Sequence, residues 1–157
     1  VDKPVRSPYE TAVLIDFPTT LTPSQGAWQL LIHHRFGTIE DISDLYGIYA
    51  PSNIKMTLDY GVTKNIMVGI ATEKNNKMQD LHWKWTILNQ TRSGRIPLSV
   101  SYFGMVALDA RQDAFFGEEY TFTNRFAYFN QLIVSRKFTP ELTLQTAVSY
   151  SHFNSVA

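Results

Sequence analysis

The four histidines of this sequence, His33, His34, His82 and His152, have the widest chemical range of its side chains. An imidazole binds transition metals, and it titrates between about pH 5 and 8. His33 and His34 are neighbours in a segment of alternating apolar and polar residues, so they point to opposite faces of a strand and cannot easily share a metal ion. We therefore expect no metal site, and we interpret the histidines as polar side chains near the ends of strands.

The one candidate pair for nucleophilic catalysis is Ser99 or Ser101 with His82. The sequence shows no carboxylate that would complete a catalytic triad with them. The chain has no cysteine, which excludes thiolate catalysis and cysteine-ligated metals. No glycine-rich phosphate loop is present. Fourteen basic and fourteen acidic residues cancel, so no basic patch favours nucleic acid. We expect a protein that is not an enzyme, carries no cofactor and binds no nucleic acid.

The elements that position these residues are extended segments in which apolar and polar side chains alternate. In the last of them Leu144, Val148 and Tyr150 share one face, while Gln145 and Ser149 share the other. No run of about 18 apolar residues predicts a membrane-spanning helix. The pattern predicts seven strands, which cover residues 27–36, 54–61, 66–71, 81–87, 98–108, 122–138 and 142–151.

The connections between these strands are predicted to alternate in length. The longer ones are residues 37–53, 73–80 and 109–121, and the shorter ones are residues 62–65, 90–97 and 139–141. Long loops at one rim and short turns at the other are typical of bacterial outer-membrane barrels. We therefore predict an all-β fold, an antiparallel up-and-down transmembrane β-barrel with its apolar face toward lipid and its polar face toward the lumen.

The lumen face of the predicted barrel carries most of the charged candidates. These side chains could set the charge selectivity for a permeating solute, or they could pair with one another and plug a small barrel. The sequence leaves both interpretations open. The candidate lumen-lining residues are Arg35, Lys55, Asp59, Lys84, Arg125, Gln131 and Lys137.

Aromatic residues gather near the ends of the predicted strands. Amphipathic rings are favoured at the level of the lipid headgroups, where membrane barrels carry two aromatic girdles. If the short turns face the periplasm, the girdle at the periplasmic rim contains Trp28, Tyr60 and Phe138. The girdle at the outer rim then contains Phe36, Tyr128 and Tyr150.

Three stretches carry a similarity to a known family: residues 26–37 (GAWQLLIHHRFG), 42–53 (ISDLYGIYAPSN) and 131–138 (QLIVSRKF). The chain resembles, along essentially its whole length, a Bacteroidota outer-membrane β-barrel family known only as a domain of unknown function. Members of that family are longer, and bacterial barrels usually close with an even strand count. The resemblance implies the N-terminal part of a barrel of about ten to fourteen strands, and it brings no catalytic motif.

Together these observations predict an integral outer-membrane protein that serves as a small pore, a structural barrel or a subunit of an envelope complex. Residues 26–157 supply strands of a barrel that continues beyond residue 157, and residues 1–25 form an N-terminal segment that is periplasmic or a first strand. The expected partners are membrane lipid and other outer-membrane or periplasmic subunits. A soluble β-barrel that binds an apolar ligand and an outer-membrane enzyme are the alternatives.

Overall fold

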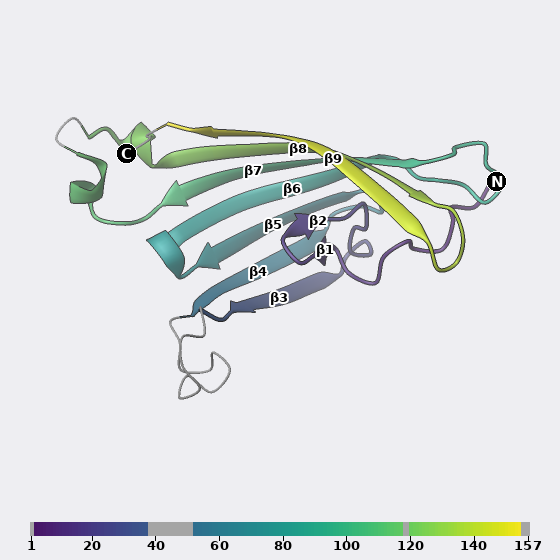
Figure 1. The fold of residues 1–157 in the computed structure, drawn as a ribbon, viewed down its shortest axis with the longest axis horizontal. Helices are drawn as coiled ribbons and strands as arrows, with labels where there is room; N and C mark the ends of the chain where they lie inside the picture. Colours follow the sequence, from purple (N-terminus) through teal and green to yellow (C-terminus); the bar gives the residue numbers. More distant parts are fainter. Residues whose placement is uncertain (1, 38–51, 118–119, 155–157) are drawn as a thin grey trace.

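The structure is a computed structural model that describes residues 2–37, 52–117 and 120–154. Within these residues, seven strands form one antiparallel sheet in which each strand pairs with the next along the chain (Figure 1). The strands are β3 (Trp28–Arg35), β4 (Asn53–Gly61), β5 (Ile66–Glu73), β6 (Met78–Leu88), β7 (Ser99–Asp109), β8 (Phe126–Lys137) and β9 (Thr143–Phe153). A separate hairpin consists of β1 (Val13–Leu14) and β2 (Phe17–Pro18). The described connections also contain the 3₁₀ helices η2 (Asn75–Lys77), η3 (Asp113–Phe116) and η4 (Phe122–Arg125).

The predicted all-β, antiparallel up-and-down fold is confirmed, and each predicted strand overlaps an observed one. The largest difference concerns the sixth predicted strand, because residues 122–125 form η4 and β8 begins only at Phe126. Strands β3 and β9 do not pair with each other, so the sheet formed by the described residues is open (Figure 1).

The two faces of the sheet have opposite chemistry. Leu30, Ile70 and Val148 on the convex face are 63%, 58% and 77% exposed. Asp59 and Lys84 on the concave face are each 1% exposed. A water-soluble barrel turns its apolar face inward, so the alternative of a soluble barrel is wrong for this sheet. The alternation with a period of two residues makes this arrangement sensitive to register, because a shift of one residue would exchange the faces.

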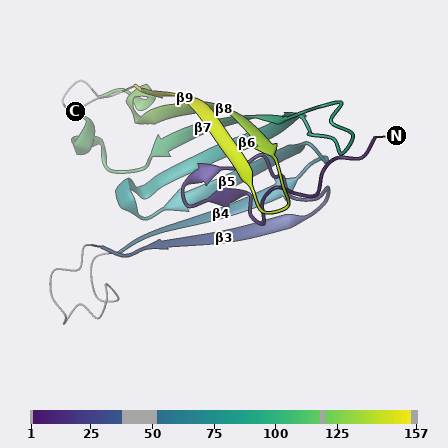
Figure 2. The ribbon, with the colours of Figure 1, turned by 45° about the vertical axis from the view of Figure 1, so that its right-hand side comes forward.

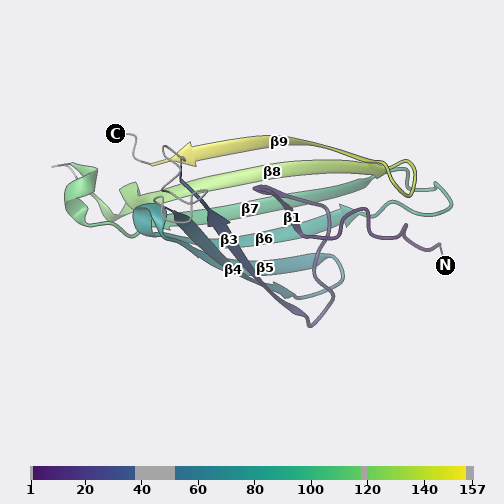
Figure 3. The ribbon, with the colours of Figure 1, turned by 60° about the horizontal axis from the view of Figure 1, so that its bottom comes forward.

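The N-terminal hairpin lies inside the curve of the sheet and covers its polar face (Figures 2 and 3). The Thr20 Oγ1 and Ser135 Oγ atoms are 2.9 Å apart, and Thr86 Oγ1 donates to the Thr20 carbonyl at 3.2 Å. Gln145 Nε2 donates to the Pro18 carbonyl at 3.1 Å. These bonds tie the segment to β6, β8 and β9. Within the described residues, the hairpin of this segment is thus a separate two-stranded sheet that packs on the interior face.

Connection lengths do not alternate as predicted. Only residues 74–77 join β5 to β6 at the rim expected to carry long loops, whereas residues 89–98 join β6 to β7 at the opposite rim. The prediction failed because β5 extends to Glu73 and β6 already begins at Met78. Both strands therefore include residues outside the clearly alternating segments, and the loop between them is shorter than predicted. The connection 110–125 is long, as predicted, and most of the predicted loop at 37–53 lies outside the described residues. No helix in the described part of the chain has the length and apolar character needed to cross a membrane.

Candidate functional site

A chain of buried polar side chains crosses the concave face from β4 to β6. Lys55 Nζ lies 2.8 Å from Asp80 Oδ2, and Asp80 Oδ1 lies 2.7 Å from His82 Nδ1. His82 Nε2 in turn lies 2.7 Å from Asp59 Oδ1. Asp59, Asp80 and His82 are 1%, 9% and 5% exposed. Hydrogen bonds to ionised groups in such a water-poor setting are among the strong ones, so this polar chain holds the two strands in register.

Gly69 of β5 makes the contact between Asp59 and His82 possible. The register places Gly69 opposite Asp59 on one side and opposite His82 on the other. A Cβ at this position would overlap Asp59 Oδ1 and His82 Nε2 and would lie 2.8 Å from His82 Cε1. Because Gly69 has no side chain, Asp59 of β4 and His82 of β6 can hydrogen-bond to each other across β5.

Both ring nitrogens of His82 face carboxylate oxygens. An ionised carboxylate only accepts hydrogen bonds, so a ring that donates from both nitrogens is the imidazolium cation. Ser101 Oγ lies 2.9 Å from Thr86 Oγ1, and Ser99 Oγ accepts from the Gln90 amide at 3.0 Å. The structure thus contradicts the pairing of either serine with His82, because both ring nitrogens are already bound.

Three of the four histidines lie near strand ends, as expected, His33 and His34 in β3 and His152 in β9. His82 lies within β6, opposite Gly69 and Met105. His152 stacks on Tyr128, the His34 ring lies 4.4 Å from the Phe36 ring in a tilted arrangement, and His33 lines a cleft on the concave side. Among the described residues, no group of three or more potential ligands is arranged to hold a metal ion.

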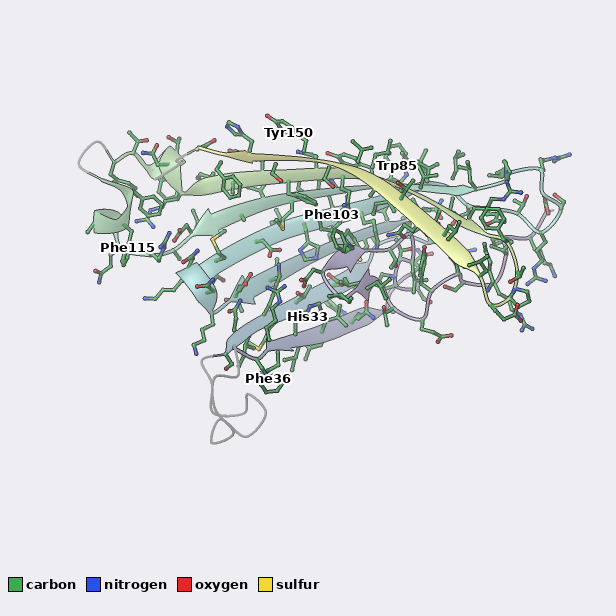
Figure 4. All side chains as sticks on the ribbon, viewed as in Figure 1. His33, Phe36, Trp85, Phe103, Phe115 and Tyr150 are labelled. Carbon is green, nitrogen blue, oxygen red and sulfur yellow. The ribbon has the colours of Figure 1, made fainter. Side chains whose placement is uncertain are left out.

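A cleft of about 250 Å³ lies between the hairpin and the sheet. Lys84 lines it, and its Nζ donates to the Ala12 carbonyl of the hairpin at 3.4 Å. Phe103 of β7 forms another part of the lining, beside the hairpin in Figure 4. The cleft therefore combines a buried cation with apolar surface.

Most of the predicted lumen residues lie on the concave face, where they are engaged. Arg35 pairs with Asp16 of the N-terminal segment at 2.5 Å and with Glu73 at 3.6 Å. Gln131 Nε2 donates to Ser149 Oγ at 2.9 Å. Lys137 Nζ reaches the carbonyl of Ser7 in the N-terminal segment at 3.4 Å. Lys55, Asp59 and Lys84 also lie on this face, and that they line a lumen stays a prediction.

Arg125 is the exception, because it lies in η4 at the rim and not on a strand. Its guanidinium donates to the carbonyls of Asp109 and Arg111 at 2.7 and 2.5 Å, and it pairs with Asp113. Hydrogen bonds to the Tyr120 hydroxyl and to Asp113 raise the pKa of Arg125 above its usual value. The alternating pattern continues through this residue, which is why the sequence placed it on the lumen face. Arg125 organises the 110–125 connection instead.

The predicted girdle residues lie near the ends of the strands. The Trp28 and Tyr60 rings are 4.7 Å apart at the rim with the 62–65 turn, where Phe138 is 52% exposed. Phe36 and Tyr150, labelled in Figure 4, are 55% and 64% exposed. Tyr128 stacks on His152 toward the same rim as Phe36 and Tyr150. A role of these rings at the headgroups stays a prediction.

Sequence reasoning missed the roles of two glycines. Gly69 lies within a predicted strand, 66–71, and its close contacts with Asp59 and His82 were not predicted. Gly104 lies opposite Trp83 on the convex face, where a Cβ would be 2.5 Å from Cε2 of the indole ring. In both cases the signal was a glycine inside a strand, which often marks a close approach by a neighbour.

An antiparallel sheet with apolar residues exposed, a polar interior face and aromatic rings near both rims is the wall of a membrane β-barrel. Comparison with protein families agrees with this class. Residues 9–157 match the family described as a membrane bound beta barrel domain (DUF5777), and the chain belongs to that family. The resemblance to a membrane β-barrel family without assigned function is thereby confirmed. No curated protein and no solved structure matches the chain.

Proposed function

We propose that this protein is an integral β-barrel of the outer membrane of a Bacteroidota-type bacterium and that it has no enzymatic activity. Its N-terminal hairpin closes the interior along this wall, so it acts as a structural barrel or as a subunit of an envelope complex and not as an open pore. The observation that carries the proposal is the placement of the hairpin. Ala12 and Thr19 are 1% and 0% exposed against a polar interior face.

The state of the interior charges supports a filled lumen. A selectivity filter acts through charges that face the permeating ion. Here Lys55 is bound by Asp80, and Arg35 is bound by Asp16 and Glu73. Charge pairing of this kind is how small barrels fill their interiors with side chains.

The two edge strands of the sheet, β3 and β9, indicate what kind of partner the sheet needs. Among the described residues, β3 and β9 each pair on one side only. An unpaired backbone group in lipid costs several kcal/mol. We therefore include in the proposal that further strands, from the same barrel or from another envelope subunit, pair with these two edges, and that lipid covers the convex face.

The test is planar-bilayer conductance of the full-length protein refolded in detergent. We expect no conductance from the wild-type protein, and we expect steps to appear when residues 8–20 are deleted. A change of electrophoretic mobility on heating shows that each variant is folded. Open, ion-selective steps from the wild-type protein would overturn the proposal.

A tethered variant tests the hairpin without a deletion. The chain has no cysteine, so Thr20→Cys combined with Ser135→Cys introduces a single cysteine pair where two side-chain oxygens are 2.9 Å apart. If the reduced variant conducts occasionally, its oxidation must abolish these events and its reduction must restore them. Events that persist in the oxidised protein would show that the hairpin does not close the lumen.

A further inference from the structure

We propose that the cleft between the N-terminal hairpin and the sheet binds a small organic carboxylate with an apolar body, its head group at Lys84 Nζ. This inference goes beyond closure of the barrel, and it holds whether or not the barrel conducts. It rests on two independent features of the cleft, a buried lysine without a carboxylate partner and a cluster of apolar side chains on a face that is otherwise polar.

Lys84 is the first feature. The side chain is 1% exposed, and its ammonium group makes one long hydrogen bond, 3.4 Å to the Ala12 carbonyl. An ammonium group has three donors, and a buried charge is costly unless it is paired. In the described ranges no carboxylate forms an ion pair with Lys84. The donors of Lys84 are therefore available to an anion that enters the cleft.

The neighbouring charges do not compete for this role, because they are already paired. Arg35 and Lys55, the other two lysine or arginine residues that line the cleft, pair with Asp16 and Asp80. Asp59, which also lines the cleft, has its Oδ1 atom 2.7 Å from His82 Nε2. A bound monoanion would neutralise Lys84 without breaking any of these pairs.

The apolar lining is the second feature, and it defines the rest of the ligand. Met67, Phe103, Met105 and Phe129 occupy positions on the interior face and line the cleft. Polar side chains are the rule on the interior face of a membrane barrel, so this cluster departs from the pattern. The Phe103 and Phe129 ring centroids are 6.2 Å apart in an edge-to-face arrangement, a geometry suited to a further flat or narrow apolar group.

The size of the cleft limits the ligand. Its volume of about 250 Å³ is slightly below the usual range of small-molecule pockets, which is about 300–1,000 Å³. The ligand class is therefore a monocarboxylate with one ring or a short alkyl chain. A single carboxylate suits the ammonium group of Lys84, whereas Arg35 and Lys55, the other described cations of the cleft, are already paired and would not neutralise the second charge of a dianion.

The experiment measures binding of 3-phenylpropanoate to the full-length protein folded in detergent, by calorimetry. Acetate tests the head group alone, and 3-phenylpropanamide tests the apolar body without the charge. We expect 3-phenylpropanoate to bind at least about tenfold more tightly than either, because charge-assisted hydrogen bonds to Lys84 require the carboxylate and the apolar wall requires the ring. Equal binding of the acid and the amide, or no binding of the acid, overturns the proposal.

Two variants locate the site. Lys84→Met keeps the length of the side chain and removes the charge, and we expect it to weaken binding of 3-phenylpropanoate about tenfold. Lys64→Met, in the exposed 62–65 turn, is the matched control and leaves binding unchanged. Unchanged binding in Lys84→Met overturns the assignment to this cleft. If that variant does not fold, the comparison of acid with amide on the wild-type protein still decides the outcome.

Discussion

Replacing Gly69 with alanine tests how the hydrogen bond between Asp59 and His82 depends on the strand between them. The added Cβ would overlap Asp59 Oδ1 and His82 Nε2, so their hydrogen bond of 2.7 Å must break or lengthen. The overlap involves the ends of two side chains, and the backbone does not have to move. We therefore expect Gly69→Ala to destabilise the sheet through loss of this bond.

The expected magnitude follows from the burial of the two partners. A hydrogen bond between charged groups contributes about 1.5–3 kcal/mol, and breaking a buried pair costs about 3–5 kcal/mol. His82 keeps its bond to Asp80, which favours the lower of these values. Alanine also suits a strand better than glycine by about 0.5–1 kcal/mol. The net loss expected for Gly69→Ala is about 0.5–2.5 kcal/mol in the free energy of unfolding.

The assay is equilibrium unfolding by urea of the protein folded in detergent, for a double-mutant cycle. The same Gly69→Ala change is made in a protein that also carries Asp59→Ala and His82→Ala, where the Cβ meets no polar side chain. There we expect the cost to vanish or to become a small gain. A loss of the same size in both backgrounds would refute the reasoning, because the cost would then come from the backbone.

Three further predictions concern other positions. Gly104→Ala forces the Trp83 ring off the convex face, and we expect a loss of about 1 kcal/mol in urea unfolding, at the low end for overpacking because the ring can move. Lys84→Met removes a buried amino group that forms no ion pair with a described carboxylate and, without ligand, raises the free energy of unfolding by about 1–3 kcal/mol. Arg125→Gln releases the two carbonyls that it binds and speeds proteolysis of the 110–125 connection at least severalfold, whereas Arg95→Gln in the 89–98 connection leaves that rate unchanged.

The strands and their faces could be predicted because alternation is a local property. Each residue of a strand shares its face with its neighbours two positions away, so alternation groups Lys55 with Asp59, and both lie on the concave face with Lys84. Arg125 was misplaced for the same reason. Its position continues the alternation of the strand that follows, although the backbone there forms η4.

The candidate site could be predicted only in part, because it depends on contacts between distant residues. Asp59 and His82 meet only when the registers of β4, β5 and β6 are all known. The position of the hairpin is even harder to predict from local sequence patterns. Its bond to Ser135 joins residues 115 positions apart, and no local feature of the N-terminal segment indicates that it lies on the interior face.

The position of the hairpin also constrains the order in which the protein can assemble. The hairpin is synthesised before every strand of the sheet, yet Pro18 accepts a hydrogen bond from Gln145, 127 residues later. Contacts this distant in sequence form late and slow folding, because a long chain must be closed before they contribute. The sheet must therefore enclose a segment whose polar groups are bonded to water until then, and β9 has to reach the sheet before the hairpin completes its contacts.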